Sequence, residues 1–280
     1  MTTAIDAPAG EEAALVAAAR RHDRAAFDRL AAQHQRRLRA VVRRLVGHPD
    51  DTDELVQEAL LRAWRSIADF RGDSAFGTWL CAIGARAAVD HLRGQRRWRA
   101  RSQVAYANEC AKSEDLAGAV GMALFSADHM YEAREHIAYC FTCVGRSLAP
   151  EDQAALVLRD VMDFGNREAA EALGISQGAL RGRLTRARAE MTAAYDGLCA
   201  LVNKTGACWQ CKGLRDASPE GRKGEEPPAI ADYQDRVGIV RAADVDRGRT
   251  QALHDACWRG TKRVEDEGRG STEPESDCGH

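Results

Sequence analysis

The chain has few aromatic residues and no long apolar run. Aromatic side chains make up 6% of its 280 residues, whereas β-strands are enriched in aromatic and β-branched residues, so the composition argues against a β-sandwich. No stretch approaches the roughly 18 consecutive apolar residues of a membrane-spanning helix, and the first residues lack the basic-then-apolar pattern of a signal peptide. These absences predict a helical, cytoplasmic protein with no membrane association.

The chain also lacks a strong net charge. Its 40 basic and 42 acidic residues leave a formal charge of −2 at pH 7, so a DNA-binding face has to be a local basic patch. The sequence contains no Gly-rich phosphate loop, no nucleophile elbow and no grouping of carboxylates with histidine that indicates catalysis. We therefore do not expect an enzyme.

Helical periodicity indicates how the chain is organised. Apolar residues recur at steps of three and four, with a break at Gly47-His48-Pro49. The prediction is an all-α protein of two helical domains joined by a flexible linker and followed by a disordered tail, because the last part has few apolar residues. The expected boundaries are a first domain at 11–98, a linker at 99–130, a second domain at 131–215 and the tail at 216–280.

Residues 166–191 have the pattern of a helix–turn–helix. Asn166 can cap a short helix, Gly174 suits a left-handed turn, and Ser176 can cap the next helix. A short scaffold helix, a tight turn and an arginine-rich second helix are typical of DNA-binding domains. The alternative is an ordinary helical hairpin with a solvated basic face.

The second helix of this motif is expected to bury Ala179 and Leu180 and to expose a basic stripe. Arginine binds phosphate and pairs with guanine edges in the major groove. Base contacts are expected from Gln177 and Arg181, which lie near the N-terminal end of the helix. The predicted DNA-contacting residues of this helix are Ser176, Gln177, Arg181, Arg183 and Arg186.

Two blocks of the chain resemble a known family. Residues 51–65, Asp-Thr-Asp-Glu-Leu-Val-Gln-Glu-Ala-Leu-Leu-Arg-Ala-Trp-Arg, and residues 70–80, Phe-Arg-Gly-Asp-Ser-Ala-Phe-Gly-Thr-Trp-Leu, resemble region two of extracytoplasmic-function sigma factors. Residues 150–191 resemble region four of the same family. The resemblance implies a non-enzymatic transcription-initiation factor that binds core RNA polymerase and promoter DNA, with an anti-sigma factor as a further possible partner.

The resemblance also implies roles for individual residues. It implies that the chain binds the β′ clamp helices and the β flap of the polymerase. The residues that match the clamp-binding surface of the family are Asp53, Glu54, Gln57, Arg62 and Trp64. The loop at 71–78 and the following helix match the part of the family that reads the minus-ten element of the promoter. The helix at 176–190 matches the part that reads the minus-thirty-five element. The minus-ten candidates are Arg71, Ser74, Thr78, Arg86, Arg93, Arg96 and Arg97. The pair Ala85-Arg86 departs from the Arg-Asn of many family members.

Two Cys-x-x-Cys pairs flank the helix–turn–helix. This spacing allows two thiolates to bind one tetrahedral zinc ion, and clustered cysteines in a reducing compartment are more often metal ligands than disulfides. The pattern His-x-x-x-Cys-x-x-Cys resembles the signature of zinc-binding anti-sigma domains. We expect one zinc ion, held by Cys140, Cys143, Cys208 and Cys211, with His136 or Cys199 as substitutes. The alternatives are a purely thiol-based switch and buried core thiols.

Two other functions stay open at this point. One is a helix–turn–helix regulator that acts without polymerase, and the other is a zinc or redox sensor whose sigma-like parts have degenerated. The blocks at 51–65 and 70–80 favour the sigma factor, because a simple repressor does not need them.

Overall fold

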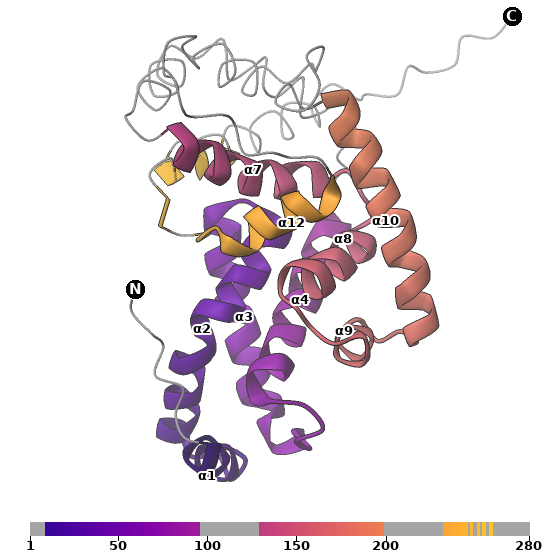
Figure 1. Ribbon diagram of the computed structural model, residues 1–280. Helices are drawn as coiled ribbons and strands as arrows, with labels where there is room; N and C mark the ends of the chain where they lie inside the picture. The colour runs from indigo at the N-terminus through magenta and orange to yellow at the C-terminus, as the bar shows by residue number, and fades with distance from the viewer. Residues whose placement is uncertain are drawn as a thin grey trace, which may run out of the picture. The chain divides into compact units, whose positions relative to one another are not determined.

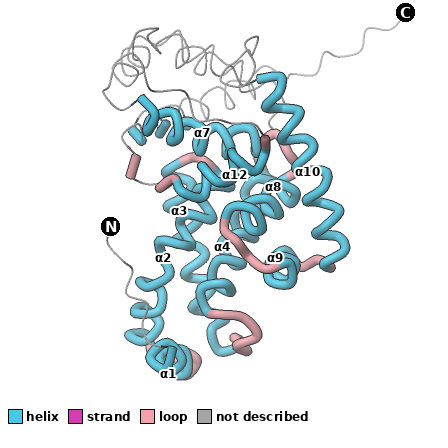
Figure 2. Tube along the Cα trace, viewed as in Figure 1, coloured by secondary structure: helices cyan, strands magenta, loops and turns pink. Residues whose placement is uncertain are grey.

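The computed structural model of the chain describes residues 9–95, 129–198 and 232–245, and residues 247–248, 251–252, 254–255 and 258–259. Every regular element in these parts is a helix, as predicted (Figure 2). The chain forms two compact units, residues 1–95 with 149–188 and residues 96–148 with 189–280. This division differs from the expected domain boundaries, because the helix–turn–helix belongs to the same unit as the N-terminal helices. The predicted linker lies outside the described residues up to residue 128.

Three long helices build the first part of unit one (Figure 1). Helices α2, α3 and α4 each pack against the other two. Leu30, Leu38, Leu45 and Leu80 are completely buried in their core, and full burial of such a side chain stabilises the fold by about 1.5–3 kcal/mol. The helices are α1 (Ala9–Ala19), α2 (Arg24–Val46), α3 (Pro49–Ser66), the 3-10 turn η1 (Ile67–Asp69) and α4 (Phe76–Gly94).

The break between α2 and α3 lies where the sequence predicted it. Gly47 ends α2 with a φ of 81°, a conformation that glycine adopts without steric cost. Pro49 is the first residue of α3, where its missing N–H is not needed. The His48 ring accepts a hydrogen bond from the Asp51 N–H at 3.4 Å. Sequence-local signals are therefore sufficient to place this turn.

The helix–turn–helix segment completes unit one. Helices α8 and α9 both pack against α4. Gln153 Nε2 donates a buried hydrogen bond to the Leu45 carbonyl at 3.0 Å, and the Arg37 guanidinium lies 5.0 Å from the centroid of the Phe164 ring. The segment thus joins the N-terminal helices through polar and aromatic contacts. Its elements are α8 (Pro150–Leu156), the π-helical turn η2 (Val157–Val161), α9 (Asn166–Leu173) and α10 (Gln177–Leu198), whose last turns extend into unit two.

Unit two contains α7 (His129–Gly145) and α12 (Tyr233–Ala242), which pack against each other. Val237 and Val240 of α12 are buried, and the Arg236 guanidinium lies 3.7 Å from the centroid of the Tyr195 ring in α10. The expectation of a largely disordered segment at 216–280 did not anticipate α12 or the buried Trp258. No helix of the described residues has both the length and the hydropathy of a membrane span.

Candidate nucleic-acid interface

The turn between α9 and α10 has the geometry of a helix–turn–helix. Gly174 adopts the left-handed conformation with φ 66° and ψ 32°, as predicted, and the Ser176 hydroxyl accepts a hydrogen bond from the Ala179 N–H at 3.1 Å. The N-terminal cap of α9 was predicted wrongly. Gly165 is the cap residue, and its N–H donates to the Glu168 carboxylate at 2.8 Å. Asn166 is the first helical residue, with its side chain turned to Arg159.

Helix α10 separates an apolar face from an exposed one. Leu180 and Leu184 are buried, whereas Gln177 and Arg181 are exposed. Residues four positions apart lie on the same helix face, so Gln177 and Arg181 form one polar surface next to the turn. Ala179 was expected in the core but is exposed, because the whole start of the helix at 176–179 is turned to solvent and burial begins at Leu180.

Three arginines of the basic stripe contact the protein's own carboxylates. Arg183 Nη1 donates to Asp152 at 2.7 Å, and Arg186 lies 3.6 Å from the same carboxylate. Arg188 forms a two-pronged pair with Asp160, at 2.9 and 2.6 Å. Planar guanidinium groups match carboxylates in this way as well as they match phosphates. Arg183 was predicted to contact DNA, but its side chain is turned to α8.

Loop 70–75 and the start of α4 form the second candidate surface. The rings of Phe70, Phe76 and Trp79 pack together, with centroids 5.0–5.9 Å apart. This aromatic cluster fixes the loop, from which Arg71 is exposed and Ser74 is half-buried. The side chains that can reach a ligand are therefore the polar ones on the outside of the loop.

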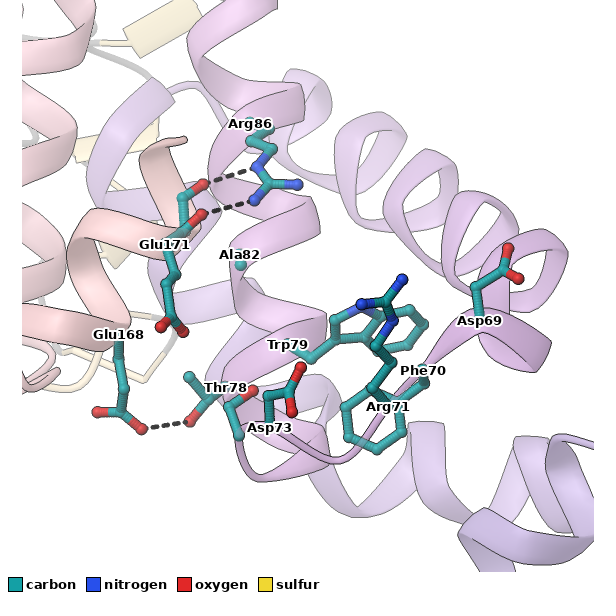
Figure 3. A pocket seen from close by; sticks show the side chains of 12 residues that line it. Asp69, Phe70, Arg71, Asp73, Thr78, Trp79, Ala82, Arg86, Glu168 and Glu171 are labelled. Carbon is teal, nitrogen blue, oxygen red and sulfur yellow. Dashed lines mark hydrogen bonds between the residues drawn. The ribbon is translucent and has the colours of Figure 1, made fainter. Parts of the chain in front are cut away.

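A cavity of about 560 Å³ lies beside this loop (Figure 3). Asp69, Arg71, Thr78 and Trp79 line one side, and residues of α9 line the other. The cavity size lies within the range of pockets that hold small ligands. Part of the predicted minus-ten surface thus faces the scaffold helix of the helix–turn–helix.

Three of the predicted minus-ten residues contact acceptor groups of the helix–turn–helix segment. The fork of Arg86 donates to the carbonyls of Ala172 and Glu171, at 2.7 and 2.8 Å (Figure 3). Thr78 is buried and lies 3.5 Å from a Glu168 carboxylate oxygen. Arg93 forms an ion pair with Glu151 at 2.6 Å. Arg96 and Arg97 lie outside the described residues.

The pKa values of Arg93 and Glu151 agree with their pairing. The hydrogen bond and the charge of Glu151 raise the pKa of Arg93 above its usual value. Burial alone would raise the pKa of the Glu151 carboxyl, but the Glu151 backbone N–H and the Arg93 guanidinium outweigh it and lower the pKa below its usual value. Both groups are therefore charged at neutral pH.

Helix α3 presents the predicted polymerase-binding residues in two different ways. Glu54 and Gln57 are exposed, and Asp53 is exposed but pairs with Arg39 of α2. Trp64 is half-buried, with its ring 5.2 Å from that of Phe27. Trp64 therefore supports the packing of α3 on α2, and the open face of α3 carries mainly polar side chains.

Sequence reasoning missed one residue on this open face. Leu61 is 51% exposed, and no other large apolar side chain in the described part of the chain has comparable exposure. It lies next to Arg62, which pairs with Glu58 at 2.6 Å. The tandem Leu60-Leu61 is the signal that was available, because one helix face cannot bury both.

The cysteine prediction falls only partly within the described residues. Cys143 is buried and Cys140 half-buried on α7, both as thiols, and Cys199, Cys208 and Cys211 lie outside the described residues. Burial lowers the pKa of His136 to about 4, so its imidazole is neutral at pH 7. No three His, Cys, Asp or Glu side chains of the described parts are arranged to hold a metal ion.

Comparison with known protein families matches both of these segments. The family model of sigma-70 region 2 matches residues 30–98, and that of sigma-70 region 4 matches residues 141–191. The first range begins within α2 and contains α3 and α4, and the second contains the helix–turn–helix of residues 166–191.

Comparison with individual proteins gives the same result. ECF RNA polymerase sigma factor SigM of Mycobacterium tuberculosis is 32% identical over 197 residues, which cover 69% of this chain and 88% of SigM. RNA polymerase sigma factor CnrH of Cupriavidus metallidurans is 31% identical, over 68% of this chain and 96% of CnrH. ECF sigma factor SigG of M. tuberculosis is 30% identical, but the match spans only 45% of SigG.

A solved structure of CnrH in complex with the cytosolic domain of CnrY covers 66% of this chain, with 26% identity and a TM-score of 0.46. The two region matches and the coverage of SigM and CnrH decide the assignment. The chain belongs to the extracytoplasmic-function family of RNA polymerase sigma factors, which direct transcription initiation and are not enzymes.

Proposed function

We propose that this sigma factor binds core RNA polymerase through the open face of α3 and directs initiation at promoters that it reads with two surfaces. Loop 71–78 and α4 read the minus-ten element, and α10 reads the minus-thirty-five element. The observation that carries the proposal is the first turn of α10, which exposes Gln177 and Arg181 directly after the left-handed turn. The N-terminal end of a recognition helix is the part that reaches base edges in the major groove.

The polymerase part of this proposal rests on the surface of α3. Leu61 offers an apolar anchor among exposed polar side chains, and apolar anchors with polar rims are common in protein interfaces. The β′ clamp helices are the proposed partner of this face, and the β flap stays a prediction of the family resemblance. An anti-sigma partner also stays a prediction.

In vitro transcription with core polymerase tests the α3 surface. We expect Leu61→Gln to lower the affinity for core polymerase about tenfold, because truncation of an interface anchor costs more than about 1 kcal/mol. Ala32→Gln is the matched control, since Ala32 is exposed on α2. A Leu61→Gln variant that binds polymerase normally would place the interface elsewhere. A wild-type chain that binds DNA but not core polymerase would favour the regulator without polymerase.

We further propose that the cysteine pairs bind one zinc ion and that metal or oxidant acts on transcription through them. Cys140 and Cys143 fit one half of such a site, because a spacing of three residues places both thiols on one side of α7. The chemistry of the set suits zinc, which prefers thiolate and imidazole ligands. The other half, Cys208 and Cys211, follows α10 in the sequence.

Elemental analysis of anaerobically purified protein tests the zinc proposal. About one zinc per chain, lost in the Cys140/Cys143/Cys208/Cys211→Ser variant, is the expected result for a four-thiolate site. The Cys110/Cys278→Ser variant is the control and should keep its zinc. Equal zinc in all three proteins would exclude this ligand set. Unchanged transcription by the wild-type chain after its metal has been removed would overturn the regulatory part of the proposal.

A further inference from the structure

Three residues beyond α12 contact α7 in order along the helix. A Cβ atom on Gly248 would lie 2.5 Å from Glu135 Oε2, so the Gly248 backbone lies directly against this carboxylate. The His254 ring stacks on that of Tyr139, with centroids 4.4 Å apart and planes at 9°. The Trp258 ring meets the same tyrosine edge-on, with centroids 5.4 Å apart. Gly248, His254 and Trp258, which we call the strap, therefore pack on one side of α7.

Cys143 lies on the turn of α7 that Trp258 spans. The indole contacts Tyr139 and also the Arg146 guanidinium, which lies 5.8 Å from its ring centroid. Cys143 is four positions after Tyr139 and three before Arg146, and residues at these spacings share one helix face. Cys143 is 7% exposed and Trp258 is 2% exposed. The buried indole therefore covers the stretch of α7 that carries the Cys143 thiol.

Cys140, the other thiol of this pair, is less enclosed. It follows Tyr139 directly, which places it about 100° further around the helix, and it is half-buried. A zinc ion bound by both thiolates would lie about 2.3 Å from each sulfur. Such an ion has to reach the covered thiol of Cys143 as well as the more open one.

We propose that the strap gates the thiol pair of α7, so that a zinc ion reaches or leaves Cys143 only when Trp258 lifts from the helix. The zinc ion is taken from the proposed function, on which this part of the inference rests. The cover over Cys143 rests on the contacts of Trp258 alone. Opening of a packed segment precedes reaction of the groups beneath it, so the strap sets the rates of metal capture and release.

Alkylation of the metal-free, reduced, full-length chain measures how often the strap opens. Iodoacetamide reaches Cys143 only in the open form, so its rate follows the population of that form when closing is fast. Trp258→Ala removes the contacts of the indole with Tyr139 and Arg146, and we expect it to raise the rate at Cys143 about tenfold. Cys140 is the reference thiol on the same helix and should change less.

Two glycine variants form a matched pair. Gly248→Ala brings a Cβ atom against the Glu135 carboxylate. It should also raise the rate at Cys143, though less than Trp258→Ala does, because the end of a glutamate side chain can shift. Gly238→Ala adds the same Cβ atom on α12, where no atom of the described residues lies within 4 Å of it, and this variant should keep the wild-type rate.

Hydrogen exchange on the same variants distinguishes opening of the strap from loss of the fold. In Trp258→Ala the amides of α7 and α12 should stay protected while Cys143 becomes reactive. Equal alkylation rates at Cys143 in the wild type and in Trp258→Ala would overturn the gate. A faster rate that comes together with loss of protection in α7 and α12 would overturn it as well, because Trp258 would then only stabilise the fold.

Transfer of zinc to a coloured chelator connects the strap with the metal. Zinc-loaded Trp258→Ala and Gly248→Ala should release the ion several-fold faster than the wild type and Gly238→Ala do. Equal release rates from all four proteins would overturn the gating of metal. A wild-type chain that binds no zinc would instead overturn the proposed zinc site, and the alkylation rates would still decide whether Trp258 covers Cys143.

Discussion

Replacing Arg181 or Arg183 by alanine removes the same charge from the same helix, yet we expect the two variants to differ in which property changes, DNA recognition or stability. Arg181 is exposed on the face that also carries Gln177. Arg183 is 28% exposed and donates to Asp152, which is 10% exposed. Arg181→Ala should therefore change DNA recognition, whereas Arg183→Ala should change stability.

The expected magnitudes follow from these surroundings. A side chain that pairs with a base edge contributes about 1–3 kcal/mol of discrimination, which is about a 5- to 150-fold change in binding ratio. Breaking a fully buried ion pair costs about 3–5 kcal/mol. Asp152 keeps some solvent and a second arginine at 3.6 Å, so we expect Arg183→Ala to cost about 1–2 kcal/mol and to lower Tm by a few degrees.

The change in DNA recognition is measured by letting the reconstituted holoenzyme select promoters from a randomised double-stranded pool. The change in stability is measured by thermal unfolding. Arg181→Ala should relax the preference at minus-thirty-five positions with an unchanged Tm. Asp152→Asn should reproduce the loss of stability seen with Arg183→Ala and should keep the wild-type preference. If Arg183→Ala relaxes the preference and Arg181→Ala does not, the assignment of the two faces of α10 is wrong.

Three further predictions concern stability and reactivity. Asp160→Ala removes both acceptors of Arg188 and should lower the free energy of unfolding by about 1–3 kcal/mol in denaturant titrations; no loss would mean that the pair contributes nothing. Gly174→Ala places a side chain in open space but at a φ of 66°, so we expect a cost of about 1–2 kcal/mol from the left-handed backbone alone, partly recovered by asparagine. Burial raises the pKa of Cys81 to about 12, so iodoacetamide should alkylate this thiol at mildly alkaline pH only after unfolding, as mass mapping can show.

The sequence was sufficient where the structural signal is local. Gly47 and Pro49 mark a helix break by their own backbone preferences, and Gly174 marks the left-handed turn in the same way. The apolar periodicity of α2, α3 and α4 predicted a helical core because its period matches the helix. Asn166 shows the limit of such signals, since Gly165 precedes it and the Glu168 side chain caps the helix from within.

Contacts between distant residues could not be predicted from the sequence. Arg86 and Ala172 are 86 positions apart, and no local pattern sets which carbonyl an exposed arginine meets. Helix α12 is a similar case, because a short helix is marginal by itself and is stabilised mainly by tertiary packing. Its partner α7 lies far away in the sequence, so the low apolar content of residues 216–280 predicted disorder instead.

An arginine in a basic stripe is not by itself evidence of a DNA contact. A guanidinium binds a carboxylate, a helix C-terminus or a phosphate with the same planar fork, and in this chain Arg188, Arg183 and Arg86 use it on internal acceptors. Under the proposed function, DNA has to compete with these acceptors for each such arginine. The contribution of such an arginine to DNA affinity is then the difference between its interaction with phosphate and its interaction with the internal acceptor. Among the described arginines of α10, Arg181 is exposed on the face that carries Gln177, and under the proposed function it binds DNA without first losing an ion pair.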